Sequence, residues 1–108
     1  MKCMTIVYPW KDGATFDFDY YQKRHMPLVA DALGNKFDRM EIRKGIVAVD
    51  GRPPPYVCVA NIWLRGALSS KDDLLGILGA RGPEVAGDVA NFTNLMPIIQ
   101  YDDVVGGR

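Results

Sequence analysis

The only histidine of the chain, His25, lies in the stretch DYYQKRHMPL at residues 19–28, four positions after Tyr21 and two before Pro27. Residues four apart share one side of a helix, so the imidazole and the phenol of Tyr21 are expected to reach a common ligand. A histidine passes a proton near neutral pH, and a phenol donates a hydrogen bond to a developing oxyanion. This pair suits proton transfer next to a carbonyl, as in cyclisation, decarboxylation or enolate formation. The alternative is structural: His25 holds a helix kink by bonding a backbone carbonyl or a polar residue such as Asn61.

Two further candidates lie in the apolar stretch Tyr56–Leu64 (YVCVANIWL). Asn61 is its one strongly polar side chain and needs a partner if it is buried. It could orient His25, contact a ligand or satisfy a loop backbone. Trp63 serves either as packing or as a binding platform.

Tyr20 and Phe92 complete the candidate ligand-binding set. Tyr20 contacts a ligand or packs at the rim of the core. In the segment 87–93 (GDVANFT), Asp88 and Asn91 favour a turn that bonds its own backbone, with Phe92 as its plug. In the functional alternative this loop closes one end of a pocket.

The composition predicts a single domain over residues 1–108, with 48% apolar and 24% charged residues. Thirteen basic residues balance thirteen acidic ones, which argues against a nucleic-acid partner. No apolar run approaches the roughly 20 residues that span a bilayer, so no membrane partner is expected. Cys3 and Cys58 are interpreted as buried, reduced thiols of a cytoplasmic protein. Neither a metal motif nor a phosphate-binding glycine loop is present, so neither a metal nor another cofactor is predicted.

Hydrophobic periodicity sets the elements that must position these side chains. A helix is expected from Asp17 or Asp19 to a C-cap at Gly34, kinked or briefly broken at Pro27. A second helix of about three turns is expected to start at Ser69 or Ser70 and to end before Gly82-Pro83. The expected strands are Cys3–Tyr8, Phe37–Val49, Tyr56–Leu64 and Leu95–Val104.

The order β-α-β-β-α-β predicts an α+β, ferredoxin-like fold with a four-stranded antiparallel sheet and both helices on one face. The opposite face would be bare, although Val57, Val59 and Trp63 point to it. Exposing each large apolar side chain forfeits about 1.5–3 kcal/mol. We therefore expect a homodimer that packs sheet to sheet.

Three segments in this order resemble the EthD family: FDFDYYQKRHMPL at 16–28, PPYVCVANIWL at 54–64 and GDVANFTNLMPIIQ at 87–100. The resemblance implies a dimeric α+β barrel, in which each protomer has a pocket between its sheet and its helices. Family members were linked to the degradation of ethyl tert-butyl ether. Relatives in the wider superfamily include cofactor-independent monooxygenases, polyketide cyclases, decarboxylases and lactone isomerases, and some bind haem. The sequence departs from the family pattern in one respect. Family members commonly place an aromatic residue in the segment 65–79, whereas this chain has none between Trp63 and Phe92.

Three functions remain open from the sequence. The first is a cofactor-independent enzyme acting on a small hydrophobic, aromatic or polyketide-like compound, with His25 as acid/base and Tyr21 as its hydrogen-bonding partner. The second is a non-catalytic carrier or accessory protein in a degradation pathway. The third is a structural dimer without a ligand site.

Overall fold

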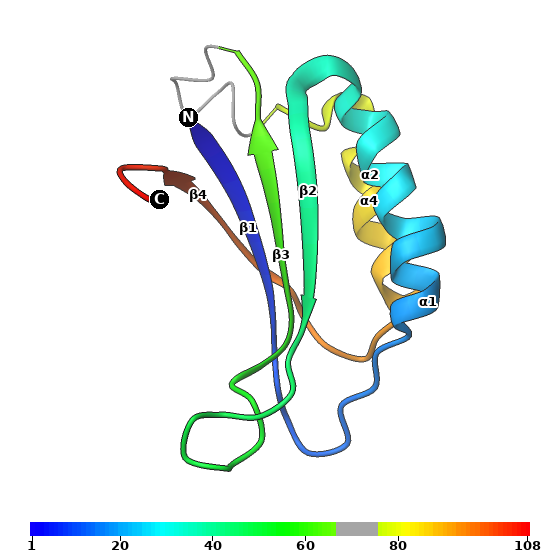
Figure 1. Ribbon diagram of the computed structural model, residues 1–108. Coiled ribbons are helices and arrows are strands. Elements are labelled where there is room, and N and C mark those ends of the chain that lie inside the picture. Colours follow the sequence, from blue (N-terminus) through cyan, green and yellow to red (C-terminus); the bar gives the residue numbers. More distant parts are fainter. Residues whose placement is uncertain (67–75) are drawn as a thin grey trace.

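The computed structural model describes residues 1–66 and 76–108 of the chain. Its four strands form one antiparallel sheet in the order β2-β3-β1-β4. All helices drawn in Figure 1 lie on one side of this sheet. The predicted ferredoxin-like α+β fold is therefore confirmed. The strands are β1 (Lys2–Pro9), β2 (Phe37–Lys44), β3 (Tyr56–Leu64) and β4 (Ile98–Asp103).

The central strand β3 shows why the sheet has two different faces. Successive side chains of a strand point to opposite sides. Every second residue of β3, from Cys58 to Leu64, is buried against the helices. The residues between them, from Val57 to Trp63, are half-buried on the other side, as predicted. We call these sides the helix face and the open face.

The first helical segment begins where the sequence predicts. The carboxylate of Asp17 accepts a hydrogen bond from the backbone N–H of Tyr20 at 3.0 Å, and Gly34 ends the segment with a positive φ of 61°. Between these caps lie α1 (Phe18–Tyr20), the wide π-helical turn η1 (Tyr21–His25) and α2 (Met26–Leu33).

The expected break near Pro27 is replaced by this wide turn. Met26 keeps helical torsions (φ −66°, ψ −35°), and its N–H bonds the carbonyl of Tyr21, five residues back. A π-turn takes up one extra residue without ending the helix. The helix thus remains continuous across the proline.

The expected start of the second helix at Ser69 or Ser70 lies outside the described residues. Gly82-Pro83 was expected to follow that helix and interrupt the chain, but a described helix, α4 (Gly82–Asp88), begins at this pair. Proline lacks an N–H, but the first turn of a helix needs no donor there, so the pair starts the helix instead. The expected loop 87–93 accordingly contains the end of α4 and the single turn η4 (Val89–Asn91).

Two strands are shorter than expected. β2 ends at Lys44 rather than Val49, because the chain beyond Gly45 leaves the sheet as an exposed loop. β4 begins at Ile98 rather than Leu95, directly after Pro97, which has no N–H to offer a ladder. Single helical turns η2 (Gly34–Lys36) and η3 (Gly79–Arg81) complete the described helical elements.

The core lies between the helix face and the helices, and an aromatic cluster occupies one part of it. The ring of Tyr8 meets those of Phe16, Tyr21 and Phe92 edge-on, with centroids 5.0, 5.8 and 5.9 Å away. Such contacts add to the burial of each ring and fix its orientation.

No helix within residues 1–66 and 76–108 has the length and apolar character needed to traverse a bilayer.

Candidate functional site

The imidazole of His25 is paired with a carboxylate from the second helix. His25 closes the wide turn η1 and is only 4% exposed. Its Nδ1 lies 2.9 Å from Oδ2 of Asp88, the last residue of α4. The pair therefore joins two helical elements that are 63 residues apart in the chain.

Asp88 is held in place by two other donors. The hydroxyl of Tyr20 donates to Oδ1 at 2.7 Å, and the side-chain amide of Asn91 donates to the same oxygen at 2.9 Å. Burial works to raise the pKa of Asp88, but the hydrogen bonds from Asn91, Tyr20 and His25 outweigh it and lower the pKa below its ordinary value. The carboxylate is thus ionised at neutral pH.

These surroundings set the tautomer of His25. Burial lowers the pKa of the imidazole below 6.5, against the opposing effect of the hydrogen bond and charge of Asp88, so the ring is neutral at pH 7. An ionised carboxylate only accepts, so Nδ1 carries the proton. The other nitrogen, Nε2, has no hydrogen-bond partner among the described residues and keeps its lone pair. A neutral imidazole in this tautomer can accept a proton at Nε2.

His25 lies in the wall of a cavity of about 280 Å³ between the helix face and the helices. Strands β1 and β4 form one wall, and α2 and α4 form the other. Apart from His25 and Tyr8, the described lining is apolar or glycine: Met4, Ile6, Val29, Leu78, Gly82, Val85, Ala86, Val89, Met96, Pro97 and Ile99. The volume lies near the lower end of the roughly 300–1,000 Å³ typical of small-molecule sites.

Tyr21 lies next to His25 but not in the cavity wall. Its ring stacks on the imidazole with centroids 5.4 Å apart, in agreement with the predicted shared side of the helix. The whole residue is buried, however, and it is absent from the cavity lining. The phenol in the cavity wall belongs to Tyr8 of β1, a residue to which the sequence assigned no role.

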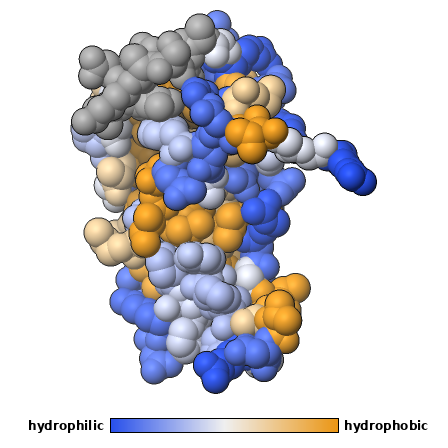
Figure 2. Space-filling model, turned by 90° about the vertical axis from the view of Figure 1, so that its left-hand side faces the viewer, coloured by the Kyte–Doolittle hydropathy of each residue, from blue (hydrophilic) through white to orange (hydrophobic). Residues whose placement is uncertain are grey.

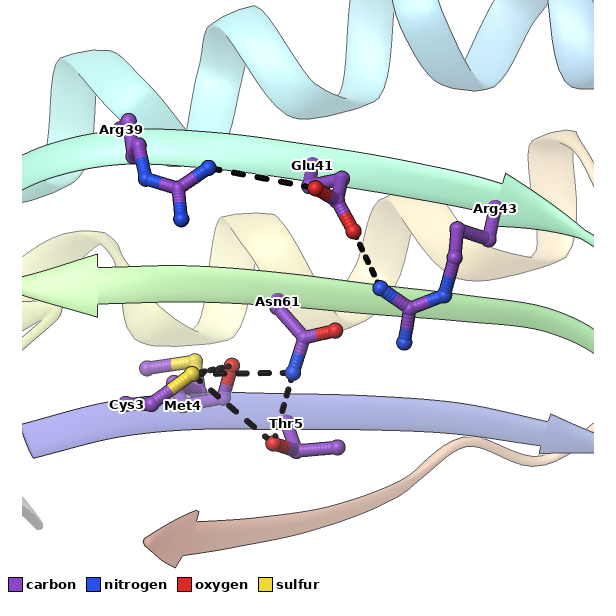
Figure 3. Close-up of polar contacts among 7 residues, drawn as sticks. All are labelled: Cys3, Met4, Thr5, Arg39, Glu41, Arg43 and Asn61. Carbon is purple, nitrogen blue, oxygen red and sulfur yellow. Dashed lines mark hydrogen bonds and ion pairs between the residues drawn. The ribbon is translucent and has the colours of Figure 1, made fainter. Parts of the chain in front are cut away.

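Asn61 and Trp63 lie on the open face, so the sheet separates them from His25 and the cavity. Figure 3 shows the amide of Asn61 directed at β1, where it donates to Thr5 Oγ1 at 2.9 Å. Trp63 packs beneath the guanidinium of Arg39, 3.6 Å from the ring centroid. Asn61 does not contact His25; Asp88 does.

Tyr20 and Phe92 contact the His25–Asp88 pair but do not line the cavity. Besides its bond to Asp88, Tyr20 stacks on Phe92 with centroids 6.2 Å apart. Phe92 is buried and lies 4.6 Å from the ring of His25. The expected backbone-bonding role of Asp88 is wrong, because its carboxylate faces side chains of the first helical segment. The only sequence signal for this role was one acidic residue amid the apolar side chains of GDVANFT.

A scan against protein families and a search of curated proteins give no match. Among solved structures, an EthD-like protein from Ralstonia eutropha JMP134 is 31% identical over 99% of this chain and 94% of its own, with a TM-score of 0.83. The chain belongs to the EthD family. An EthD family protein from Bacillus halodurans C-125 is 15% identical over 91% of this chain and 96% of its own, with a TM-score of 0.57. HapK from Hahella chejuensis is 11% identical over 100% and 97%, with a TM-score of 0.56. These two similarities show a shared fold.

In this EthD protein, two of the stretches that carried the resemblance meet at one point. The stretch 16–28 supplies His25 and Tyr20, and the stretch 87–100 supplies Asp88 and Asn91. Among the described residues, no group of three or more His, Cys, Asp or Glu side chains is placed to hold a metal ion. The polar side chains that the structure brings together here are the imidazole of His25, the carboxylate of Asp88 and the phenol of Tyr20.

Proposed function

We propose that this EthD-family protein binds a small, largely apolar molecule with an enolisable carbonyl and that His25 removes a proton next to that carbonyl. The observation that carries the proposal is the His25–Asp88 pair in the wall of an otherwise apolar cavity. The cavity also disfavours the alternative of a dimer with a filled interior.

The proposed step uses only groups of the protein and the ligand. A C–H bond next to the carbonyl breaks, its proton forms a new N–H bond at Nε2 of His25, and the electron pair passes to an enolate. Asp88 holds the ring through Nδ1 and stabilises the imidazolium that forms. The apolar walls beside His25 strengthen these charge interactions, because they lower the local dielectric constant.

The test uses 2-tetralone, a bicyclic ketone with acidic hydrogens at C1, as the probe. Incubated in D2O with the protein, it should gain deuterium at C1 faster than in buffer, as followed by NMR. Replacing His25 by Gln should lower the enzymatic rate about 100-fold or more, the range typical of a lost acid/base group. Asp88→Asn should lower it less, since the imidazole remains but is no longer held by an anion.

Isothermal titration calorimetry with the same ketone separates catalysis from carriage. Binding without accelerated exchange would remove the proton-transfer role and leave a carrier of hydrophobic metabolites. If the ketone neither binds nor exchanges, the cavity is not a site for this class of molecule, and both roles are wrong.

The same proposal includes a homodimer formed through the open face. Figure 2 views this side and shows hydrophobic surface at its centre, bordered by hydrophilic residues. Val7 and Val59 pair across the central strands β1 and β3, while Arg39, Glu41 and Arg43 form a charged ladder along β2. A second copy packed sheet to sheet would cover the apolar centre and leave the charges at the rim.

Light scattering coupled to gel filtration tests the dimer. The wild-type protein should show twice the chain mass of 12.0 kDa. Val59→Lys should give the mass of one chain, because it places a charge in the middle of the proposed interface. The matched control Val47→Lys, in the exposed loop after β2, should keep the larger mass. A wild-type protein with the mass of one chain would contradict the proposal.

A further inference from the structure

The cavity has a second polar side chain besides His25, and it comes from the sheet. Tyr8 of β1 is in the wall, only 1% exposed. Three aromatic rings enclose it edge-on, as described above, so its orientation is fixed. A rigid phenol in an apolar wall offers a ligand one directed hydrogen bond with little loss of side-chain entropy.

Next to Tyr8 lies the hydroxyl of Tyr21, which lacks a hydrogen-bond partner among the described residues. This hydroxyl is buried. Burying a hydroxyl without a partner costs free energy, so native structures leave few such groups. The unpaired group therefore calls for an explanation.

The neighbour best placed to accept from Tyr21 is Tyr8. Burial raises the pKa of both phenols, so both are protonated at neutral pH. The proximity of the Tyr21 hydroxyl acts in the opposite sense on Tyr8, lowering its pKa as a hydrogen-bond donor does. Regular hydrogen-bond geometry is not reached between the two hydroxyls in the arrangement seen here.

We infer that Tyr8 is the second ligand-contacting residue of the cavity, that its hydroxyl donates to a carbonyl or enolate oxygen of the ligand, and that Tyr21 is a positioning residue that donates to Tyr8. This inference rests on the proposed function and narrows its substrate class. With Nε2 of His25 as acceptor and Tyr8 as donor, the cavity matches a molecule that carries an oxygen and an acidic hydrogen on neighbouring carbons.

The two polar groups have complementary parts in the proposed step. While the proton moves from carbon to Nε2, negative charge develops on the oxygen. The Tyr8 hydroxyl, which keeps its proton, stabilises this charge, and the bond from Tyr21 strengthens its donor character. A hydrocarbon of the same shape would leave both polar groups unpaired, so the cavity discriminates against it.

The test compares 2-tetralone with tetralin, which has the same two rings but no oxygen, by isothermal titration calorimetry. Wild-type protein should bind the ketone more tightly than the hydrocarbon. Tyr8→Phe keeps the ring and removes only the donor, so it should weaken ketone binding about fivefold and leave tetralin binding unchanged. The matched control Tyr56→Phe, at an exposed tyrosine that does not line the cavity, should change neither affinity.

Tyr21→Phe tests the positioning role. It should lower the affinity for the ketone about twofold and leave tetralin binding unchanged, because it removes the hydroxyl that donates to Tyr8 and keeps the ring. Ketone affinity at the wild-type value would overturn the role of Tyr21. Equal wild-type affinities for the two compounds would overturn the inference for Tyr8 while leaving the cavity as a binding site. Failure of both compounds to bind would overturn the proposed function together with this inference.

Discussion

The helix face and the open face of the sheet are built from the same four strands, yet polar side chains on the two sides differ in whether they have hydrogen-bond partners. On the open face, Thr5 is bonded to both Asn61 and Asp102 on the neighbouring strands. On the helix side, Nε2 of His25 and the Tyr21 hydroxyl have no such partner among the described residues. A face whose polar groups satisfy one another is suited to packing, whereas a side with unpaired polar groups beside a cavity is suited to a ligand.

The largest effect should come from the same substitution made on each face. Ile62, on the helix face, is fully buried, and Ile98, on the open face, is 57% exposed. Ile62→Ala should lower the free energy of unfolding by about 2–5 kcal/mol, since it leaves a cavity in the core. Ile98→Ala should lower it by less, since the chain itself leaves this side chain largely exposed and only the second copy of the proposed homodimer would cover it. Urea denaturation measures both, and equal losses would mean that the open face is as well covered in solution as the helix face.

Between pH 5 and 7.5, the change of the unfolding free energy with pH should reflect the titration of His25, on the helix side of the sheet. The folded pKa of His25 is lowered below 6.5, so between these two values the unfolded chain binds more protons than the folded one. The unfolding free energy should therefore be highest above pH 6.5 and fall as the pH drops from 6.5 toward the folded pKa. Urea denaturation at a series of pH values between 5 and 7.5 measures this slope.

His25→Gln is the control for that slope, because the chain has one histidine. The variant should lose most of the pH dependence above pH 5.5, while the contribution of Asp88, whose folded pKa is also lowered, appears only at more acidic pH. An imidazole resonance that titrates above pH 6.5 in NMR would contradict the assignment of His25 as a neutral base.

The smallest effect should follow from changing Asn61. Asn61→Ala removes the 2.9 Å bond to Thr5, which keeps its bond to Asp102, so the loss of stability should be about 1 kcal/mol or less. Calorimetry should find the affinity for 2-tetralone unchanged, because the sheet separates residue 61 from the cavity. A clear loss of ketone affinity would show that the two faces are coupled and would return Asn61 to the ligand-binding set.

Much of the fold could be predicted because its signals are local. The alternation in β3, the Asp17 cap and the Gly34 terminus each depend on residues within one or two turns, and all three are as expected. The start of α4 was missed because Gly82-Pro83 can either end a helix or begin one. The choice depends on where the chain can dock on the sheet, which local sequence does not specify.

The site was harder to predict because its contacts are distant in sequence. His25 was identified from its uniqueness and its place on an apolar helix side, but its carboxylate lies 63 residues away. Tyr8 looks like any core residue of a strand, since a cavity next to it is a property of packing rather than of pattern. Asn61 stood out as polar, yet the alternation of β3 puts its side chain on the other face of the sheet from Cys58 and Ile62, and hence away from the helices.

The wide turn η1 has a consequence for chains of a different length. A π-turn holds one residue more than a regular turn, so deleting a single residue there would restore an ordinary helix rather than break it. Such a shortened chain would keep its fold, but the part of the helix before the deletion would be rotated by about 100° relative to the part after it. The number of residues between the Asp17 cap and Pro27 thus ties Tyr20 and His25 to a single carboxylate, and relatives lacking that residue should need a different partner for one of them.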